Sequence, residues 1–287
     1  MIFNDVEGEH LGGGVVLFKE ALTWDWSLFV EIIEAELVKD HGEMYTPAIH
    51  PETGENCFLN KSGYYFDART VANMPRRASR MHQTENDVLR GFLSFLEESR
   101  DMYLLKYLEQ FPMAFKSIWW KVKGHAVSYT PGVYLGAHAD TSADYVYGLP
   151  EPSDQLATRN TVTCLIYLNS SIEENRGSLD FSGGHHYFNY LDIEVVPSRG
   201  DVLFFPSNYM ATHEVKPTTA GIRYSYLGWY SHGTPNSLVN ESVIDPLKVP
   251  DAAEHATNVY MPTLREDFIA SVKKRGAIVS IPGMRFD

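Results

Sequence analysis

Short apolar runs separated by turn residues dominate the middle of the sequence. β-Branched and apolar side chains fill residues 126–129, 161–169, 202–205 and 222–230, and Pro, Gly, Asp or Asn stands beside each run. Runs of this length with such boundaries are typical of strands. The middle of the chain is therefore predicted to be built from short strands.

Helical periodicity occurs on either side of this region. From Asp25 to about Asp40 apolar residues recur at helical spacing, and Gly42 indicates the end of that helix. Residues 87–111 hold enough apolar positions for one or two helices. A further helix is predicted from Leu264 to Arg275, with cations in its last turn where they suit the helix dipole. We expect these helices to pack outside the sheet, and no repeat or linker divides the chain.

Three His-x-Asp/Glu triplets occur, and their surroundings differ. His41-Gly42-Glu43 lies where the first helix is predicted to end, and His50-Pro51-Glu52 lies in a loop, so both are interpreted as surface polar groups. His138-Ala139-Asp140 instead follows a predicted strand and turn, and His213 and Arg223 come later beside further strands. Two imidazoles and one carboxylate leave one face of an iron ion open for a co-substrate and dioxygen. The arginine favours a carboxylate co-substrate.

The adjacent pair His185-His186 is a weaker metal candidate. Neighbouring residues of a strand point to opposite faces, and Val195 and Val196, not arginines, stand ten residues further on. We interpret these histidines as structural or substrate-facing.

Seven short motifs follow one another in the predicted strand region. They are Tyr129-Thr130-Pro131-Gly132, His138-Ala139-Asp140, Tyr167-Leu168-Asn169, Gly177-Ser178-Leu179-Asp180-Phe181, Arg199-Gly200-Asp201-Val202-Leu203-Phe204-Phe205, His213 and Gly221-Ile222-Arg223-Tyr224-Ser225. In this order they resemble the prolyl 4-hydroxylase-like Fe(II)/2-oxoglutarate oxygenases over about residues 122–232. The resemblance implies a mainly β protein with packed helices, whose core is a double-stranded β-helix of the jelly-roll or cupin-like type. One domain is expected over residues 1–287, with a helical N-terminal region and with residues 1–121 and 233–287 as helical and loop elaborations.

The resemblance also assigns the metal site. His138, Asp140 and His213 would bind Fe(II), and Arg223 would bind the distal carboxylate of the co-substrate 2-oxoglutarate through a bidentate pair. Dioxygen is the third reactant. Strand alternation independently places Ser225 on the same face as Arg223, where its hydroxyl can reach the same carboxylate.

Two tyrosines match positions whose phenols hold 2-oxoglutarate in the family. They are Tyr167 and Tyr129, of which Tyr167 ranks slightly higher, although a buried tyrosine bonded to a backbone carbonyl is an equal interpretation of either. Residues 141–160 form a longer connection than a tight turn needs, and we expect a lid there. Tyr145 and Tyr147 in this segment, with Trp229, are the candidate substrate contacts.

Departures from the family pattern and the overall charge limit the possible substrates. Collagen-type prolyl 4-hydroxylases usually have Lys where Arg223 stands, so the resemblance supports the superfamily better than collagen-type hydroxylation. The net charge of -13 disfavours nucleic acid as a partner. Nucleic-acid demethylases of the superfamily carry a second Arg where this chain has Trp229. A small-molecule substrate is therefore favoured, with a protein substrate as the alternative.

Composition indicates a cytoplasmic protein that does not enter a membrane. Cys57 and Cys164 are the only cysteines, so a disulfide framework is not expected, and the N-terminus is acidic where a secretory signal would be basic. No apolar run approaches the ~20 residues of a membrane span. The oligomeric state is not predicted.

The sequence predicts an Fe(II)- and 2-oxoglutarate-dependent dioxygenase. It would hydroxylate an unactivated C–H bond of an amino acid or related small molecule, with release of succinate and carbon dioxide. The alternatives are desaturation, cyclisation or epimerisation at the same centre, or hydroxylation of a prolyl or other residue in a protein. A non-catalytic, metal-stabilised barrel is a further alternative, but it has no need of Arg223 and Ser225 together.

Overall fold

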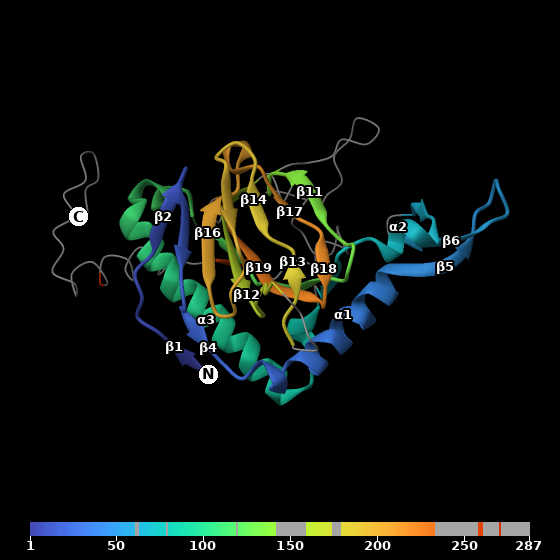
Figure 1. The fold of residues 1–287 in the computed structure, drawn as a ribbon, viewed down its shortest axis with the longest axis horizontal. Coiled ribbons are helices and arrows are strands. Elements are labelled where there is room, and N and C mark those ends of the chain that lie inside the picture. The colour runs from blue at the N-terminus through green and yellow to red at the C-terminus, as the bar shows by residue number, and fades with distance from the viewer. Residues whose placement is uncertain are drawn as a thin grey trace.

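Two antiparallel sheets lie at the centre of the molecule (Figure 1). The computed structural model describes residues 1–60, 63–78, 80–118, 120–141, 159–173, 179–232, 258–260 and 270. The main sheet has nine strands, and its path runs in the order β2-β3-β16-β12-β19-β10-β8, with β9 paired to β19 and β20 paired to β9. These strands are β2 (Glu9–Gly12), β3 (Val15–Phe18), β8 (Arg76–Ala78), β9 (Trp120–Val122), β10 (His125–Tyr129), β12 (Asn160–Tyr167), β16 (Val202–Pro206), β19 (Arg223–Ser231) and β20 (Asn258–Tyr260).

The second sheet has four strands in the order β11-β17-β14-β15. They are β11 (Leu135–His138), β14 (His186–Phe188), β15 (Ile193–Val195) and β17 (His213–Val215). A two-stranded ladder of β13 (Ser182–Gly183) and β18 (Thr218–Ala220) lies beside it. The predicted double-stranded β-helix with packed helices is confirmed, and the predicted strands of the middle region are present.

Side-chain alternation gives the main sheet two different faces. On β12, Leu165 and Tyr167 pack between the two sheets with Val15, Leu17 and Phe205, whereas Cys164 and Ile166 belong to the cluster under the helices. Both faces of these strands are covered, which is why residues 161–169 read as one continuous apolar run. We call the face toward the second sheet the inner face and the opposite one the outer face.

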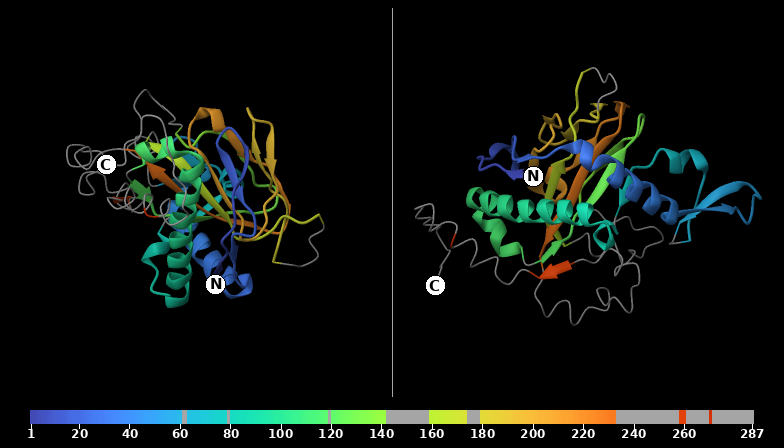
Figure 2. Two further views of the ribbon diagram at one scale, coloured as in Figure 1. Left: turned by 90° about the vertical axis from the view of Figure 1, so that its left-hand side faces the viewer. Right: turned by 90° about the horizontal axis from the view of Figure 1, so that it is seen from below.

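Two helices cover the outer face, as Figure 2 shows from two further sides. Helix α1 (Val30–Met44) follows a 3-10 turn, η1 (Trp26–Leu28), so it begins later than predicted and continues past Gly42. Helix α3 (Asp87–Gln110) is a single helix whose N-cap, Asn86, accepts hydrogen bonds from the backbone N–H groups of Val88 and Leu89. The helix predicted from Leu264 to Arg275 lies outside the described residues apart from Ala270. Among the described residues, no helix combines the length and hydrophobicity that a membrane span requires.

The N-terminal region contributes more strands than its sequence predicts. The hairpin β2–β3 extends the main sheet beside β16, and β8 closes the other end of its path. The remaining elements are β1 (Ile2–Phe3), β4 (Leu22–Thr23), β5 (Tyr45–Ile49), β6 (Asn56–Asn60), β7 (Tyr65–Phe66), α2 (Ala68–Ala72), η2 (Met81–Gln83), η3 (Pro112–Ser117) and η5 (Tyr209–Ala211). These strands are too short to show a period of two, so only the Gly12-Gly13-Gly14 turn before β3 indicates one of them.

Three tyrosines on the outer face of β19 donate hydrogen bonds to carboxylates of the covering helices. Tyr224 Oη lies 2.8 Å from Glu34 Oε2 on α1, Tyr226 Oη lies 2.7 Å from Glu97 Oε1 on α3, and Tyr230 Oη lies 3.0 Å from Asp101 Oδ1 on α3. We call these three contacts the phenol tethers. They fix β19 against both helices.

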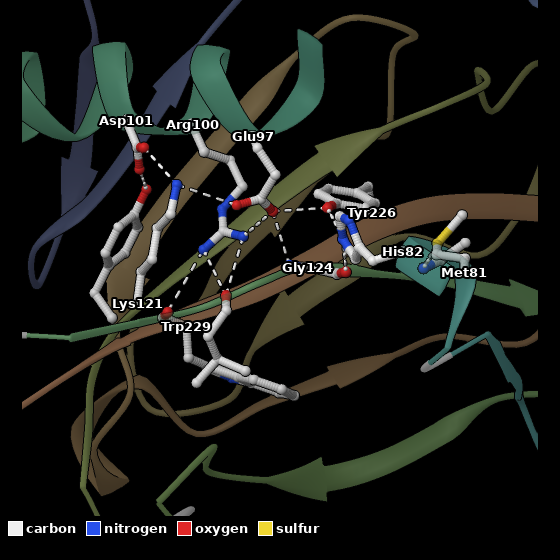
Figure 3. A network of polar contacts seen from close by, with 12 residues as sticks. Met81, His82, Glu97, Arg100, Asp101, Lys121, Gly124, Tyr226 and Trp229 are labelled. Carbon is white, nitrogen blue, oxygen red and sulfur yellow. Dashed lines mark hydrogen bonds and ion pairs between the residues drawn. The ribbon is translucent and has the colours of Figure 1, made fainter. Parts of the chain in front are cut away.

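Glu97 is also the centre of a buried ionic network between α3 and the main sheet (Figure 3). Its carboxylate pairs with Arg100 at 2.7 Å and with Lys121 at 3.2 Å, and it accepts the backbone N–H of Gly124. Arg100 in turn donates to the backbone carbonyls of Val122 and Trp229. An ideal Cβ on Gly228 would lie only 2.4 Å from Arg100 Nη1, so a glycine is needed where the guanidinium crosses the strand.

The network predicts a specific loss of stability in acid. Burial raises the pKa of Glu97, but Arg100 and Lys121 outweigh it and lower the pKa from 4.5 to about 2. The depressed pKa contributes stability that is fully present above about pH 4.5 and is lost as the pH falls toward 2. Denaturant unfolding would be measured at neutral pH and through this acidic window. At neutral pH the Glu97→Gln variant should have a lower free energy of unfolding than the wild type. Its free energy of unfolding should also change less as the pH falls. Parallel pH profiles would contradict this account.

Candidate metal centre and anion pocket

His138, Asp140 and His213 are brought together where the ends of β11 and β17 meet. His138 and His213 are register partners, and Asp140 lies two residues beyond β11. One ligand atom from each residue lies within 4.8 Å of the other two. Both His Nε2 atoms lie near Asp140 Oδ1, at 3.5 Å for His138 and 3.9 Å for His213. More than seventy residues separate His213 from the other two along the chain, and the pairing of β11 with β17 brings them together.

Backbone contacts orient both imidazoles in the same way. His138 Nδ1 lies 2.9 Å from the carbonyl oxygen of Gly136, and His213 Nδ1 lies 3.0 Å from that of Ala211. Because a carbonyl oxygen can only accept, each Nδ1 carries the proton and each Nε2 keeps its lone pair. Both lone pairs are then available near Asp140 Oδ1.

The carboxylate is held by a short chain of hydroxyl groups. Thr163 Oγ1 on β12 donates to Asp140 Oδ2 at 2.5 Å and lies 2.9 Å from Ser207 Oγ. Oδ2 is engaged in this way, and Oδ1 remains for a cation. Burial raises the pKa of Asp140, but His213, His138 and the Thr163 hydroxyl outweigh it and hold that pKa well below its ordinary value. Burial lowers the pKa of His213. An ionised carboxylate and a neutral imidazole are the forms that bind metals.

Arg223 lies in the interior on the inner face of β19, only 1% exposed. Its Nη1 contacts Ser225 Oγ at 3.3 Å, and its Nε and Nη2 have no hydrogen-bond partner among the described residues. The guanidinium carbon lies 4.8 Å from the ring centroid of Tyr129 and 5.7 Å from that of Tyr167. Strand register explains the grouping, since Tyr129 pairs with Arg223 and Tyr167 pairs with Ser225.

Further unpartnered polar atoms surround this guanidinium. Among the described residues, the Tyr167 hydroxyl and Thr218 Oγ1 are buried without a hydrogen-bond partner. Gly184 lies against both Thr218 and the arginine, because an ideal Cβ there would lie 2.9 Å from Arg223 Cδ and 3.1 Å from Thr218 Oγ1. Its φ of +62° is also one that glycine adopts readily. A buried cation and buried hydroxyls without internal partners lower the stability of the fold. We call this group of residues around Arg223 the anion pocket, and its free donors suit a ligand that accepts hydrogen bonds.

The family of this region follows from its sequence. Residues 124–231 match the family model described as the 2OG-Fe(II) oxygenase superfamily. This region of the chain is similar to the 2OG-Fe(II) oxygenases. The matched residues contain every member of the His-Asp-His triad and of the anion pocket, and the family's cofactors are Fe(II), 2-oxoglutarate and dioxygen. The resemblance to this superfamily found in the motifs is confirmed. No curated protein sequence matches this chain.

Solved structures similar to this chain include several prolyl hydroxylases. A prolyl hydroxylase from Trichoplax adhaerens, in complex with a hypoxia inducible factor peptide fragment, is 17% identical, with a TM-score of 0.47 over 80% of this chain and 88% of that one. A viral collagen prolyl hydroxylase from Paramecium Bursaria Chlorella virus-1 is 13% identical, with a TM-score of 0.44 over 78% and 98%. A Pseudomonas putida prolyl-4-hydroxylase is 18% identical, with a TM-score of 0.43 over 77% and 94%.

The candidate substrate contacts are only partly described. Trp229 is half-buried, and Figure 3 shows its indole pointing away from the buried ionic network. Its register partner on β12 is Thr163, so the indole shares the inner face with the hydroxyl that contacts Asp140. Tyr145 and Tyr147 lie outside the described residues, as does most of the segment 141–160 that was expected to form a lid.

The structure adds three residues that the motifs did not identify. Thr163 and His186 lie beside the triad, and Thr218 lies beside the anion pocket. Alternation along β12 places Thr163 on the same face as Tyr167, a signal that could have identified it. The prediction that His185 and His186 face opposite sides is confirmed, since His185 pairs with Glu194 at 3.0 Å whereas His186 is buried. Burial, with His213 and Arg223 nearby, lowers the pKa of His186 well below its ordinary value.

Proposed function

We propose that this oxygenase hydroxylates an unactivated C–H bond of an amino acid or related small molecule, using Fe(II) held by His138, Asp140 and His213. In this proposal 2-oxoglutarate is bound by Arg223, Ser225, Tyr167 and Tyr129. The single observation that carries it is the guanidinium of Arg223, which is buried on the inner face beside a triad of metal-ligand type and whose Nε and Nη2 have no hydrogen-bond partner among the described residues.

The residues fit both cofactors. Two neutral imidazoles and an ionised carboxylate on one side of an ion are the ligand set of non-haem Fe(II) oxygenases, and they leave other positions open. The anion pocket offers a planar fork with free N–H groups and two hydroxyls, which suits a carboxylate. When bound together, Fe(II), 2-oxoglutarate and dioxygen supply the oxidant that replaces a C–H hydrogen with hydroxyl, releasing succinate and carbon dioxide.

The chain's own residues bind, orient and exclude water. Arg223 and Ser225 would hold the distal carboxylate, and the apolar cluster of β3, β12 and β16 keeps solvent from the inner face. The rings of Tyr129 and Tyr167 lie against the guanidinium and fix its plane. Thr163 holds the unused oxygen of Asp140, so the carboxylate keeps one orientation.

One experiment tests the reaction and separates the substrate classes. The anaerobic Fe(II)- and 2-oxoglutarate-loaded protein would be mixed with oxygen and either a panel of free amino acids and small metabolites or short proline-containing peptides. Succinate release coupled to a mass gain of one oxygen in a small molecule supports the proposal. The same gain confined to peptides would replace the small-molecule substrate with a peptide. A loss of two hydrogens would indicate desaturation or cyclisation instead.

Thr163→Val should weaken metal binding without unfolding the protein. The change removes the hydroxyl that orients Asp140 and nearly conserves the side-chain volume. Loss of such an outer partner typically reduces metal affinity about 10- to 100-fold. Thr163→Ser keeps the hydroxyl and should bind Mn(II) almost as the wild type does. Equal Mn(II) affinities of the Val and Ser variants would show that the contact does not support the metal.

We also infer that residues 1–287 form one domain. The outer-face core contains Phe18 of β3, Ile33 of α1 and Leu96 of α3 together with Ile166 and Phe204 of the family region. A hydrophobic core shared in this way supports a single folding unit.

A further inference from the structure

His186 is a buried imidazole without a hydrogen-bond partner. It is 3% exposed, and neither Nδ1 nor Nε2 has a partner among the described residues. An imidazole always carries at least one N–H donor, whatever its protonation state. Leaving a buried donor unpaired costs about 1–3 kcal/mol, so the position requires an explanation.

The surroundings of His186 place it between the metal centre and the anion pocket. It lies on β14, where its register partner is Val215 and where Phe188, two residues further, pairs with His213. Its ring stacks on His213, with centroids 4.7 Å apart and planes 20° apart, and it also contacts the rings of Phe188 and Phe205. Two residues before it on the same chain segment, Gly184 lies against Arg223. The wall from Gly184 to His186 therefore runs from the guanidinium to the triad.

Stacking on His213 argues against a fourth metal ligand. Metal-binding lone pairs of imidazole lie in the plane of the ring, and a ligand nitrogen must approach the ion to about 2 Å. Two stacked rings in nearly parallel planes cannot both contain one ion at that distance. Accordingly, the ligand-type cluster in the described residues consists of His138, Asp140 and His213 and does not include His186.

We propose that His186 is a 2-oxoglutarate-binding residue, which donates a hydrogen bond to the co-substrate between its metal end and its Arg223 end. This inference rests on the proposed function. A ligand that extends from the triad to Arg223 passes along this wall, and 2-oxoglutarate carries oxygen acceptors for the free N–H. His186 from the second sheet and Thr218 from the β13–β18 ladder then complete a pocket whose other donors come from the main sheet.

The inference predicts opposite effects on stability and on co-substrate affinity. His186→Phe keeps a ring that can stack on His213 and removes both unpartnered polar atoms. Thermal unfolding of the metal-free protein should therefore occur at the same or a higher temperature than in the wild type. Affinity for 2-oxoglutarate, measured calorimetrically on the Mn(II)-loaded protein, should fall about tenfold or more, because a hydrogen bond to a charged group is lost. Mn(II) affinity should not change.

Matched variants make the test decisive. His185→Phe, on the opposite face of the same segment, should bind 2-oxoglutarate as the wild type does. If the larger ring prevents folding, His186→Leu and His186→Asn replace it, and Asn should retain more affinity because it keeps an N–H donor. Unchanged 2-oxoglutarate affinity in His186→Phe, or equal affinities of the Leu and Asn variants, would overturn the assignment, as would a loss confined to Mn(II) binding. A wild-type protein that binds no 2-oxoglutarate would overturn the proposed function as well.

Discussion

Asp140→Ala is expected to end metal binding and 2-oxoglutarate turnover together. The carboxylate is the only anionic member of the triad, and its Oδ1 is the atom that both imidazole Nε2 atoms approach. Loss of a mere outer partner costs about 10- to 100-fold in metal affinity, so loss of a ligand should cost at least as much. Mn(II) titration and succinate production at limiting iron measure the two effects. His213→Ala should behave similarly.

Two other histidines provide controls for this experiment. His41 lies in the last turn of α1, and His50 lies in the turn between β5 and β6, where its Nδ1 accepts backbone N–H groups. His41→Ala and His50→Ala remove imidazoles from similar His-x-Glu triplets and should leave metal binding and turnover unchanged. Wild-type succinate production by Asp140→Ala at limiting iron would show that the triad does not bind the metal.

Arg223→Ala should produce a selective loss of 2-oxoglutarate affinity. Removing one partner of a buried, hydrogen-bonded charge pair costs roughly 2–5 kcal/mol, which corresponds to about a 30-fold or larger loss. Arg223→Lys keeps the charge but not the planar fork, so its loss should be smaller. Mn(II) affinity should stay nearly constant in both variants, since Arg223 does not belong to the triad.

An alternative explanation is that Arg223 has a structural role. A structural arginine would pair with an acidic neighbour, and its loss would lower stability without affecting 2-oxoglutarate. Among the described residues, Arg223 donates to the Ser225 hydroxyl and forms no ion pair with an acidic side chain, so no ion pair is lost in the alanine variant. Titrating 2-oxoglutarate into folded Arg223→Ala decides between the two explanations. Unchanged affinity would remove Arg223 from the co-substrate site.

Sequence motifs located the metal triad because its members follow predicted strands and belong to a known pattern. Alternation alone was enough to place Ser225 beside Arg223, a prediction that the structure bears out geometrically. His186 could not be assigned in this way. Its relation to His213 depends on the pairing of β14 with β17, which joins residues 25 or more positions apart along the chain and leaves no local signal.

The strands at the edges of the main sheet were missed for a different reason. β3 is a four-residue strand whose side chains are all buried, so it shows neither alternation nor helical spacing. The end of α1 was misplaced because Gly42 was read as a stop, although nothing lies within 4 Å of a Cβ at this position and the helix continues through it. The low helix propensity of a single glycine is weak evidence for the end of a helix, because tertiary packing can override it.

The phenol tethers give the two faces of β19 different roles. The outer face anchors the strand, and the inner face carries the residues of the candidate site. Arg223 and Ser225, at odd-numbered positions of β19, lie on the inner face, while Tyr224, Tyr226 and Tyr230 on the outer face are hydrogen-bonded to the helices. A slip of one residue would exchange the two sets, and the anchors oppose such a slip. Hydrogen bonds on the outer face therefore fix the position of β19. Donors on its inner face can remain without partners until a ligand binds. Substitutions on the inner face that change substrate preference can accordingly accumulate without lowering the stability of the fold.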